Sequence, residues 1–294
     1  MQFNCREDII QITSAWKGER FDDGRPRVPD HVLRRLRSIT FEEAWGPMHQ
    51  KGYPRQYECN LRATHPGRQL VGRAVTCVMV PQREDLNSAM LEEGQQRENR
   101  HGTFNQWVID NLVEDDVVVV DLFDKIVNGT FVGGNLSTAI ASRTRNGGAV
   151  IWGGIRDYEQ IVKIENFQCF FRGVDPNGIG EVTMVGINIP CRIGAATCLP
   201  GDVVLGTISG VIFIPPHLAE EVCIHAEKSH LRDIFGFQRL KEKVYTTAQI
   251  DTAWTYDMMK DFVSWASEAA EAEPYRHLEW SDELERARLL EKKT

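Results

Sequence analysis

Residues 147–157 read Gly-Gly-Ala-Val-Ile-Trp-Gly-Gly-Ile-Arg-Asp, and this stretch decides how the chain folds. The apolar run at 149–152 is typical of a strand buried on both faces of a helix-covered sheet. It ends in two glycines, followed by Arg156 and Asp157. Open α/β sheets bind ligands beyond the carboxyl ends of their strands, so Arg156 could clamp a carboxylate and Asp157 could bind magnesium or manganese. An exposed arginine beside a helix-capping aspartate is the alternative.

Outward from this stretch, strands and helices alternate, which predicts a layered α/β domain over 35–235. An N-terminal arm at 1–34 and a helical C-terminal extension at 236–294 flank it. We expect a capping box at 40–43 and a solvated or subunit-wrapping helix pair at 247–294. The other predicted segments are a loop at 48–69, strands at 70–81, 117–120, 149–152 and 168–171, helices at 84–99, 103–113, 136–145 and from 158, a β-rich region at 180–215, and helix again from 217.

Composition excludes several classes of protein. The chain has 294 residues, of which 42% are hydrophobic, and 34 Lys and Arg against 42 Asp and Glu give a net charge of −8. An acidic chain is not expected to bind nucleic acid. Without an apolar run of about 18 residues or a signal sequence, we expect no membrane partner and a cytoplasmic location. The seven cysteines show no C-x-x-C spacing, which favours reduced, buried thiols over a disulfide framework or a zinc site.

A second glycine turn lies at 131–136, where Phe-Val-Gly-Gly-Asn-Leu leads into a predicted helix. Glycines here would let backbone N–H groups approach an anion at the positive end of the helix. A plain turn with an asparagine cap is the alternative. The turn is neither a G-x-G-x-x-G fingerprint nor a P-loop.

Several sequence blocks occur in an order that resembles one known family. The run at 147–157 resembles the G-x-R-D signature of the RraA-like superfamily, which contains 4-hydroxy-4-methyl-2-oxoglutarate/4-carboxy-4-hydroxy-2-oxoadipate aldolases and regulators of ribonuclease E activity. The resemblance covers about 35–230. Its further blocks are 72–76 (Gly-Arg-Ala-Val-Thr), 118–121 (Val-Val-Val-Asp), 133–136 (Gly-Gly-Asn-Leu), 171–173 (Phe-Arg-Gly), 200–204 (Pro-Gly-Asp-Val-Val) and 210–215 (Gly-Val-Ile-Phe-Ile-Pro).

The resemblance implies an α/β/β-type sandwich that assembles as a homotrimer or homohexamer, with the site between subunits. It implies that Arg156 binds the substrate carboxylate and polarises the oxo group. It also implies that Asp157 ligates Mg²⁺ or Mn²⁺, with water at most of the remaining positions. Gly133, Gly134 and Leu136 would then provide backbone N–H groups to the substrate.

The chain departs from the aldolase pattern at one catalytic position. The resemblance implies an acidic residue 21 positions before the arginine, but the chain has Asn135 there. Asparagine can orient water but cannot act as a base, so decarboxylation is less affected than retro-aldol cleavage. Gln160 stands where another acidic residue is often found, with Glu159 beside it. Gln106 stands near the position of a histidine that some members carry.

The expected function is a divalent-metal-dependent carbon–carbon lyase, an aldolase or a decarboxylase, that acts on a 2-oxo acid through a pyruvate-enolate-like intermediate. Two alternatives stay open: a hydrolase or dehydratase that uses the same metal site, and a non-catalytic binding protein of the ribonuclease-regulator type. The sequence does not identify the substrate, the carboxylate that a neighbouring subunit would add, or the role of the two extensions.

Overall fold

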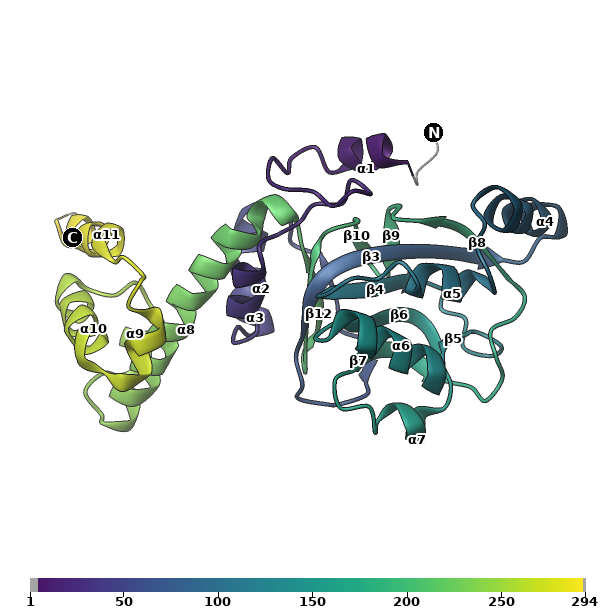
Figure 1. Cartoon of the computed structure of the whole chain (residues 1–294). Coiled ribbons are helices and arrows are strands. Elements are labelled where there is room, and N and C mark those ends of the chain that lie inside the picture. The colour runs from purple at the N-terminus through teal and green to yellow at the C-terminus, as the bar shows by residue number, and fades with distance from the viewer. Residues whose placement is uncertain (1–4, 293–294) are drawn as a thin grey trace. The chain divides into compact units, whose positions relative to one another are not determined.

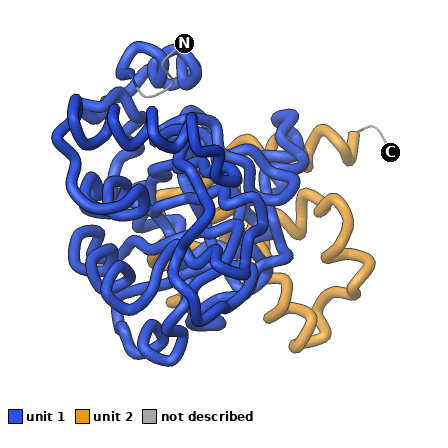
Figure 2. The backbone as a smooth tube through the Cα atoms, turned by 90° about the vertical axis from the view of Figure 1, so that its right-hand side faces the viewer, with its two compact units in different colours: residues 1–222 blue, residues 223–294 orange. Residues whose placement is uncertain are grey.

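The structure is a computed structural model that describes residues 5–292. Its internal contacts divide the chain into two units, residues 1–222 and 223–294, which Figure 2 shows in different colours. The first unit contains the sheet and all the predicted site residues. The division into an arm at 1–34, a domain at 35–235 and an extension at 236–294 stays a prediction.

A ten-stranded mixed sheet forms the body of the first unit. Its centre is parallel, in the order β3-β4-β6-β7, and β4 is buried at every residue, as its apolar run predicts. Antiparallel β11, β12 and β1 continue the sheet beyond β3, and β2 adds to β7. β9 and β10 pair with each other in a separate two-stranded sheet. The strands of both sheets are β1 (Tyr57–Glu58), β2 (Arg62–Ala63), β3 (Leu70–Pro81), β4 (Asp116–Asp121), β5 (Thr130–Val132), β6 (Gly148–Ile155), β7 (Gln168–Val174), β8 (Val182–Ile187), β9 (Cys191–Ile193), β10 (Ala196–Cys198), β11 (Val203–Thr207) and β12 (Gly210–Ile214).

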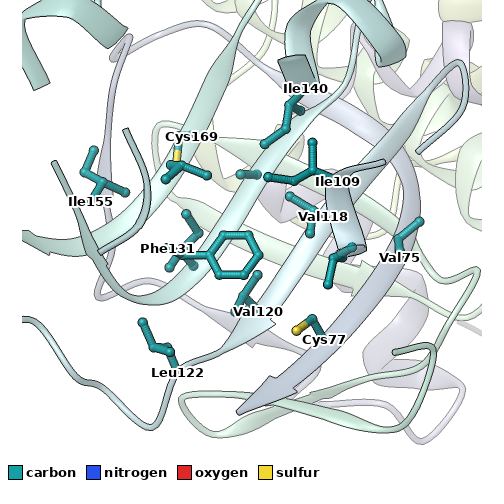
Figure 3. Packing of buried hydrophobic residues seen from close by; sticks show 14 of the residues in the cluster. Val75, Cys77, Ile109, Val118, Val120, Leu122, Phe131, Ile140, Ile155 and Cys169 are labelled. Atoms are coloured by element: carbon teal, nitrogen blue, oxygen red, sulfur yellow. The ribbon is translucent and has the colours of Figure 1, made fainter. Parts of the chain in front are cut away.

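Helices cover one face of the parallel strands (Figure 1). Val118 and Val120 of β4 share a large buried cluster with Ile109 of α5 and Ile140 of α6, and Figure 3 shows these side chains together. Each large side chain buried in this way contributes about 1.5–3 kcal/mol. The helices that begin in this unit are α1 (Arg6–Ile12), α2 (Asp30–Leu36), α3 (Phe41–Gln50), α4 (Glu84–Glu92), η1 (Glu93–Arg97), α5 (Phe104–Ile109), α6 (Gly134–Thr144), α7 (Tyr158–Ile161), η2 (Pro216–Leu218) and α8 (Ala219–Lys241).

Further strands cover the opposite face. Val117 of β4 shares a second buried cluster with Val204 of β11 and Phe213 of β12. The sheet curls back on itself, because a Cβ built on Gly206 in β11 would lie 2.4 Å from the Phe170 ring in β7, although β3, β4 and β6 separate these strands in the sheet order. Helices, central strands and folded-back strands make three layers, which confirms the predicted α/β/β sandwich.

A buried ion pair fastens the N-terminal arm to the sheet. Arg25 Nη1 lies 2.9 Å from Asp116 Oδ1 at the start of β4, and Nη2 lies 3.3 Å from Oδ2. Both side chains are almost fully buried. Breaking such a pair leaves an uncompensated charge and costs about 3–5 kcal/mol. The arm is therefore an integral part of the first unit.

The second unit has a hydrophobic core of its own. Its segments after α8 are α9 (Thr247–Ile250), α10 (Tyr256–Glu268), η3 (Ala270–Tyr275) and α11 (Ser281–Glu291). The Phe262 ring centroid lies 5.4 Å from that of Phe235 and 4.6 Å from that of Trp280. The tail is therefore not a solvated helix pair. Its aromatic residues are far apart in sequence and meet only once the helices fold.

Local predictions hold with small differences. The capping box at Thr40 and Glu43 is confirmed, whereas the predicted loop at 48–69 includes the end of α3 and the short edge strands β1 and β2. The helix predicted to continue to 99 gives way to the π-helical turn η1, where Gly94 packs directly on the Trp107 ring.

Five cysteines are buried as expected, while Cys5 is half-buried and Cys59 is exposed. Across residues 5–292, every helix is too short or too polar to cross a membrane.

Candidate active site

Strand β6 brings Arg156 to the carboxyl end of the parallel strands. β6 runs parallel to β5, with Ile155 opposite Val132, and the backbone N–H of Arg156 donates to the Val132 carbonyl at 3.0 Å. The glycine turn at 133–134 follows β5 directly. The pairing therefore brings together the two segments that the sequence singles out.

Asp157 turns its carboxylate toward this glycine turn. Its backbone is left-handed, with φ 55° and ψ 34°, a conformation that aspartate and asparagine tolerate better than most residues. Its Oδ2 accepts the N–H of Gly134 at 3.1 Å. Although Asp157 stands at the N-cap of α7, its side chain makes no capping hydrogen bond. The carboxylate therefore does not cap its own helix, α7, and instead accepts the first N–H of α6.

Arg156 and Asp157 form a loose, solvent-accessible pair. Arg156 Nε lies 3.8 Å from Asp157 Oδ2, and the side chains are 46% and 34% exposed. An ion pair this exposed contributes only about 0–1 kcal/mol to folding. The arrangement does little for stability, but it leaves a cation and an anion accessible to a ligand.

Gly133 and Gly134 make room for these side chains. A Cβ on Gly133 would lie 2.4 Å from Asp157 Oδ2 and 2.9 Å from Arg156 Nε. A Cβ on Gly134 would lie 2.5 Å from Gln160 Oε1. Glycine at 133 is therefore a condition for the observed position of the Arg156–Asp157 pair.

The other two predicted residues lie on the first turn of α6. The N-cap of α6 is Gly133, which has no side chain to cap the helix, so the turn is not the asparagine-capped turn of the alternative interpretation. Asn135 is exposed, while the half-buried Leu136 packs against the main apolar cluster. The N–H of Gly134, one of the expected substrate donors, is already bonded to Asp157.

The glycines at 153–154 serve packing instead. Both lie within β6 and are buried. A Cβ on Gly153 would lie 2.8 Å from the Leu122 side chain and 3.0 Å from the Lys125 carbonyl, and one on Gly154 would lie 2.9 Å from the Ile126 carbonyl. Gly154 N–H donates to the carbonyls of Lys125 and Gly129. These glycines let the loop between β4 and β5 lie directly on β6.

The sequence does not single out Asn105, a residue that holds β5, the strand leading into the glycine turn. This buried side chain on α5 donates from Nδ2 to the Phe131 carbonyl at 2.9 Å. Its Oδ1 accepts from Thr103 Oγ1 at 2.7 Å and from the N–H of Gln106 at 3.1 Å. The capping pattern of Thr103 and Gln106 marks this helix start in the sequence, but it does not reveal that the amide between them reaches β5.

The donor set suits a hard divalent cation that keeps most of its water. Residues 5–292 contain no group of three or more His, Cys, Asp or Glu side chains that could hold a metal. Asp157 uses Oδ2 for Gly134 and Arg156, and Oδ1 has no hydrogen-bond partner among the described residues. Mg²⁺ is often bound through one or two carboxylates, with waters and substrate oxygens as its other ligands. Asp157 fits that pattern and does not fit a zinc site, which needs three or four protein ligands.

Comparison with known proteins agrees with this architecture. A sequence model of the RraA-like family, described as Aldolase/RraA, matches residues 28–213. Protein DlpA of Legionella pneumophila is 28% identical over 164 residues, which are 55% of this chain and 24% of that protein. A putative 4-hydroxy-4-methyl-2-oxoglutarate aldolase of Halalkalibacterium halodurans is 30% identical over 118 residues, which are 40% of this chain and 55% of that protein. The match thus spans about a quarter of the first relative and about half of the second.

Among solved structures, the chain is similar to RraAS2 of Streptomyces coelicolor, described as an unusual member of the RNase ES inhibitor RraA protein family. The TM-score is 0.62 and the identity 24%, over 72% of this chain and 100% of that one. At this identity the likeness shows the fold and leaves the activity open.

Proposed function

Because the chain belongs to the Aldolase/RraA family, we propose that it is a divalent-metal-dependent carbon–carbon lyase that acts on a small 2-oxo acid. The main observation in support is the exposed Arg156–Asp157 pair, which lies against the glycine turn at 133–134. A guanidinium and a carboxylate in this position contribute little to folding, so ligand binding accounts for their placement better than stability does. The aldolase named among the relatives supports the same reaction class.

In this proposal Asp157 holds Mg²⁺ or Mn²⁺, which when bound supplies electrophilic stabilisation of negative charge. Arg156 binds the substrate carboxylate bidentately and fixes its orientation. Cleavage of the bond beyond C3 leaves a pyruvate enolate, whose developing charge the Arg156 guanidinium stabilises. Gly133, Gly134 and Leu136 form the adjoining substrate wall, at the positive end of the α6 dipole.

Asn135 decides which cleavage we favour. Retro-aldol cleavage needs a base to remove a hydroxyl proton, and an asparagine side chain cannot do this. Decarboxylation of oxaloacetate or a related acid forms the same enolate without that base. We therefore place decarboxylation first and aldol cleavage second. Asn135→Asp tests this order, because it should raise aldol cleavage of 4-hydroxy-4-methyl-2-oxoglutarate relative to decarboxylation of oxaloacetate.

We also propose that the site is completed between subunits of a homotrimer or homohexamer. In the single chain both side chains of the pair are open to solvent, whereas electrostatic catalysis is strongest where water is excluded. Size-exclusion chromatography with light scattering on the full chain tests this. A trimer or hexamer is expected, and a monomer that retains full activity contradicts it.

A pyruvate-release assay with Mg²⁺ or Mn²⁺ across a panel of 2-oxo acids tests the reaction class. We expect metal-dependent release from oxaloacetate, suppressed by chelation and lost in Asp157→Asn, which keeps a residue that tolerates the left-handed backbone. If folded protein releases no pyruvate from any panel member with either metal, the lyase proposal fails. Substrate loss without pyruvate would indicate the hydrolase or dehydratase alternative, and no turnover at all would favour the non-catalytic one.

A further inference from the structure

A cavity of about 240 Å³ lies inside the first unit, between the N-terminal arm and the turn that precedes β11. Ile12 and Trp16 line it from the arm, and Pro215 lines it from the end of β12. Asp202 closes it at the turn. It is a mostly apolar chamber with a carboxyl group in its wall, separate from the Arg156–Asp157 site.

Asp202 is buried without a charged partner. The residue is 4% exposed, and its side chain has one hydrogen bond among residues 5–292, in which the Leu199 N–H donates to Oδ2 at 2.8 Å. In the same turn, Gly201 has φ 84° and packs directly on Pro26 of the arm. The second oxygen, Oδ1, has no hydrogen-bond partner in the described part of the chain and is not fully buried, so it is open to a donor from the cavity.

Gln56 lines the same cavity. Its Oε1 has no hydrogen-bond partner in the described part of the chain, but almost none of that atom's surface is open to the cavity. An anion offers no donor to the free carboxyl oxygen of Asp202, and an apolar molecule would leave that oxygen unsatisfied. The complementary ligand carries several N–H donors on an apolar body.

We propose that this cavity binds a small primary amine, whose ammonium group donates to Asp202 while its hydrocarbon part packs against Ile12, Trp16 and Pro215. An ammonium supplies three donors from one atom, and pairing with a carboxylate satisfies both charges. The inference does not depend on the proposed lyase activity, because the cavity shares no residue with that site.

The titratable groups around Asp202 determine the charge of the cavity and the pH dependence of amine binding. Burial raises the pKa of Asp202 to about 8, so the empty site is largely uncharged at neutral pH. Burial and Asp202 raise the pKa of the neighbouring Cys198 thiol well above its usual value, and partial burial lowers the pKa of His217. The Cys198 thiol therefore stays neutral. Tyr53 also lines the cavity, and Arg20 is hydrogen-bonded to Thr13 and to the Gly24 carbonyl.

Binding of an amine should ionise Asp202 and release a proton. The affinity for the amine should therefore increase as pH rises from 6 to 8.

Isothermal titration of the full chain with benzylamine tests the proposal, run in phosphate and in Hepes so that proton release can be measured. Benzyl alcohol and benzoate are the matched probes without the positive charge. Asp202→Asn keeps an acceptor for the Leu199 N–H, and Ala15→Phe adds a bulky side chain to the arm wall of the cavity. Asp85→Asn removes an exposed carboxylate outside the cavity and is the control. Thermal unfolding verifies that each variant is folded.

We expect one saturable benzylamine site that releases a proton, weakens about 10- to 100-fold in Asp202→Asn, disappears in Ala15→Phe and is unchanged in Asp85→Asn. Benzoate should not bind. Three results would each overturn the proposal: no saturable benzylamine binding to the wild type, unchanged binding in Asp202→Asn or Ala15→Phe, or benzyl alcohol binding as tightly as benzylamine.

Discussion

The glycine pairs at 133–134 and 153–154 look alike in sequence, but they do different work. A side chain on Gly133 would meet the charged groups of Asp157 and Arg156. A side chain on Gly153 would meet the Leu122 side chain and the backbone of the loop between β4 and β5. The first pair makes room for the side chains of the Arg156–Asp157 pair and Gln160, and the second makes room for packing.

The role of a glycine therefore depends on which atoms a Cβ at that position would touch. The far ends of Asp157 and Arg156 can move aside, so an added methyl group at 133 should cost function and little stability. The loop backbone at 122–126 is hydrogen-bonded to β6 and cannot move without disturbing the sheet, so an added methyl at 153 should cost stability. Substitutions at Arg156 and at three of these glycines distinguish loss of function from loss of stability.

The largest effect should come from Arg156→Ala. Loss of the guanidinium removes both the carboxylate clamp and a charge that stabilises the enolate, so kcat/KM should fall by about 10³-fold or more. Because the side chain is exposed, thermal unfolding should be unchanged. Pyruvate-release kinetics and calorimetry measure the two quantities. Wild-type kinetics in the variant would remove Arg156 from the site.

Gly133→Ala should act on the same site less severely. The new Cβ would displace the Asp157 carboxylate, and a misplacement of about 1 Å in a catalytic group can cost 10²-fold in rate. We expect that loss in metal-dependent turnover, with a melting temperature close to that of the wild type. A variant that is mainly unfolded would show instead that Gly133 has the packing role assigned to Gly153.

Gly153→Ala should give the reverse pattern. Overpacking against Leu122 and the Lys125 carbonyl should lower the free energy of unfolding by about 1–3 kcal/mol, measured by urea denaturation. Turnover per folded molecule should remain, because Gly153 does not contact Asp157. Equal stability of this variant and the wild type would mean that the loop does not lie on β6 as the structure describes.

Gly134→Ala should have the smallest effect. The added methyl would meet only the far end of Gln160, an exposed side chain that can move, and the N–H that Asp157 accepts is retained. Alanine in the first turn of α6 should leave stability unchanged or raise it by up to about 1 kcal/mol. The same assays apply, and a loss as large as that of Gly133→Ala would contradict the distinction between these two neighbours.

The sequence predicts the fold well because its strands are compositional runs. The apolar segments at 70–81 and 117–120 correspond closely to β3 and β4, since central strands of a covered sheet cannot alternate polar and apolar residues. The C-terminal core escaped prediction because Phe235, Phe262 and Trp280 belong to separate helices whose packing is not local.

The candidate site is predicted less completely. The proximity of the R-D pair to the glycine turn follows from the family resemblance, and the structure shows the hydrogen bond from Gly134 to Asp157. The role of Asn105 could not be predicted, because an amide in a helical turn gives no sign of the strand it will meet. The packing role of Gly153 and Gly154 could not be predicted either, because it depends on a loop whose path the sequence does not specify.

Mn²⁺ titration of the full chain, followed by electron paramagnetic resonance with and without oxalate, tests the central claim most directly. Oxalate presents the two adjacent oxygens of a 2-oxo acid. The account predicts about one Mn²⁺ per site, bound more tightly with oxalate, at least tenfold weaker in Asp157→Asn, and no longer enhanced by oxalate in Arg156→Ala. Mn²⁺ affinity that is equal in the wild type and Asp157→Asn would contradict it.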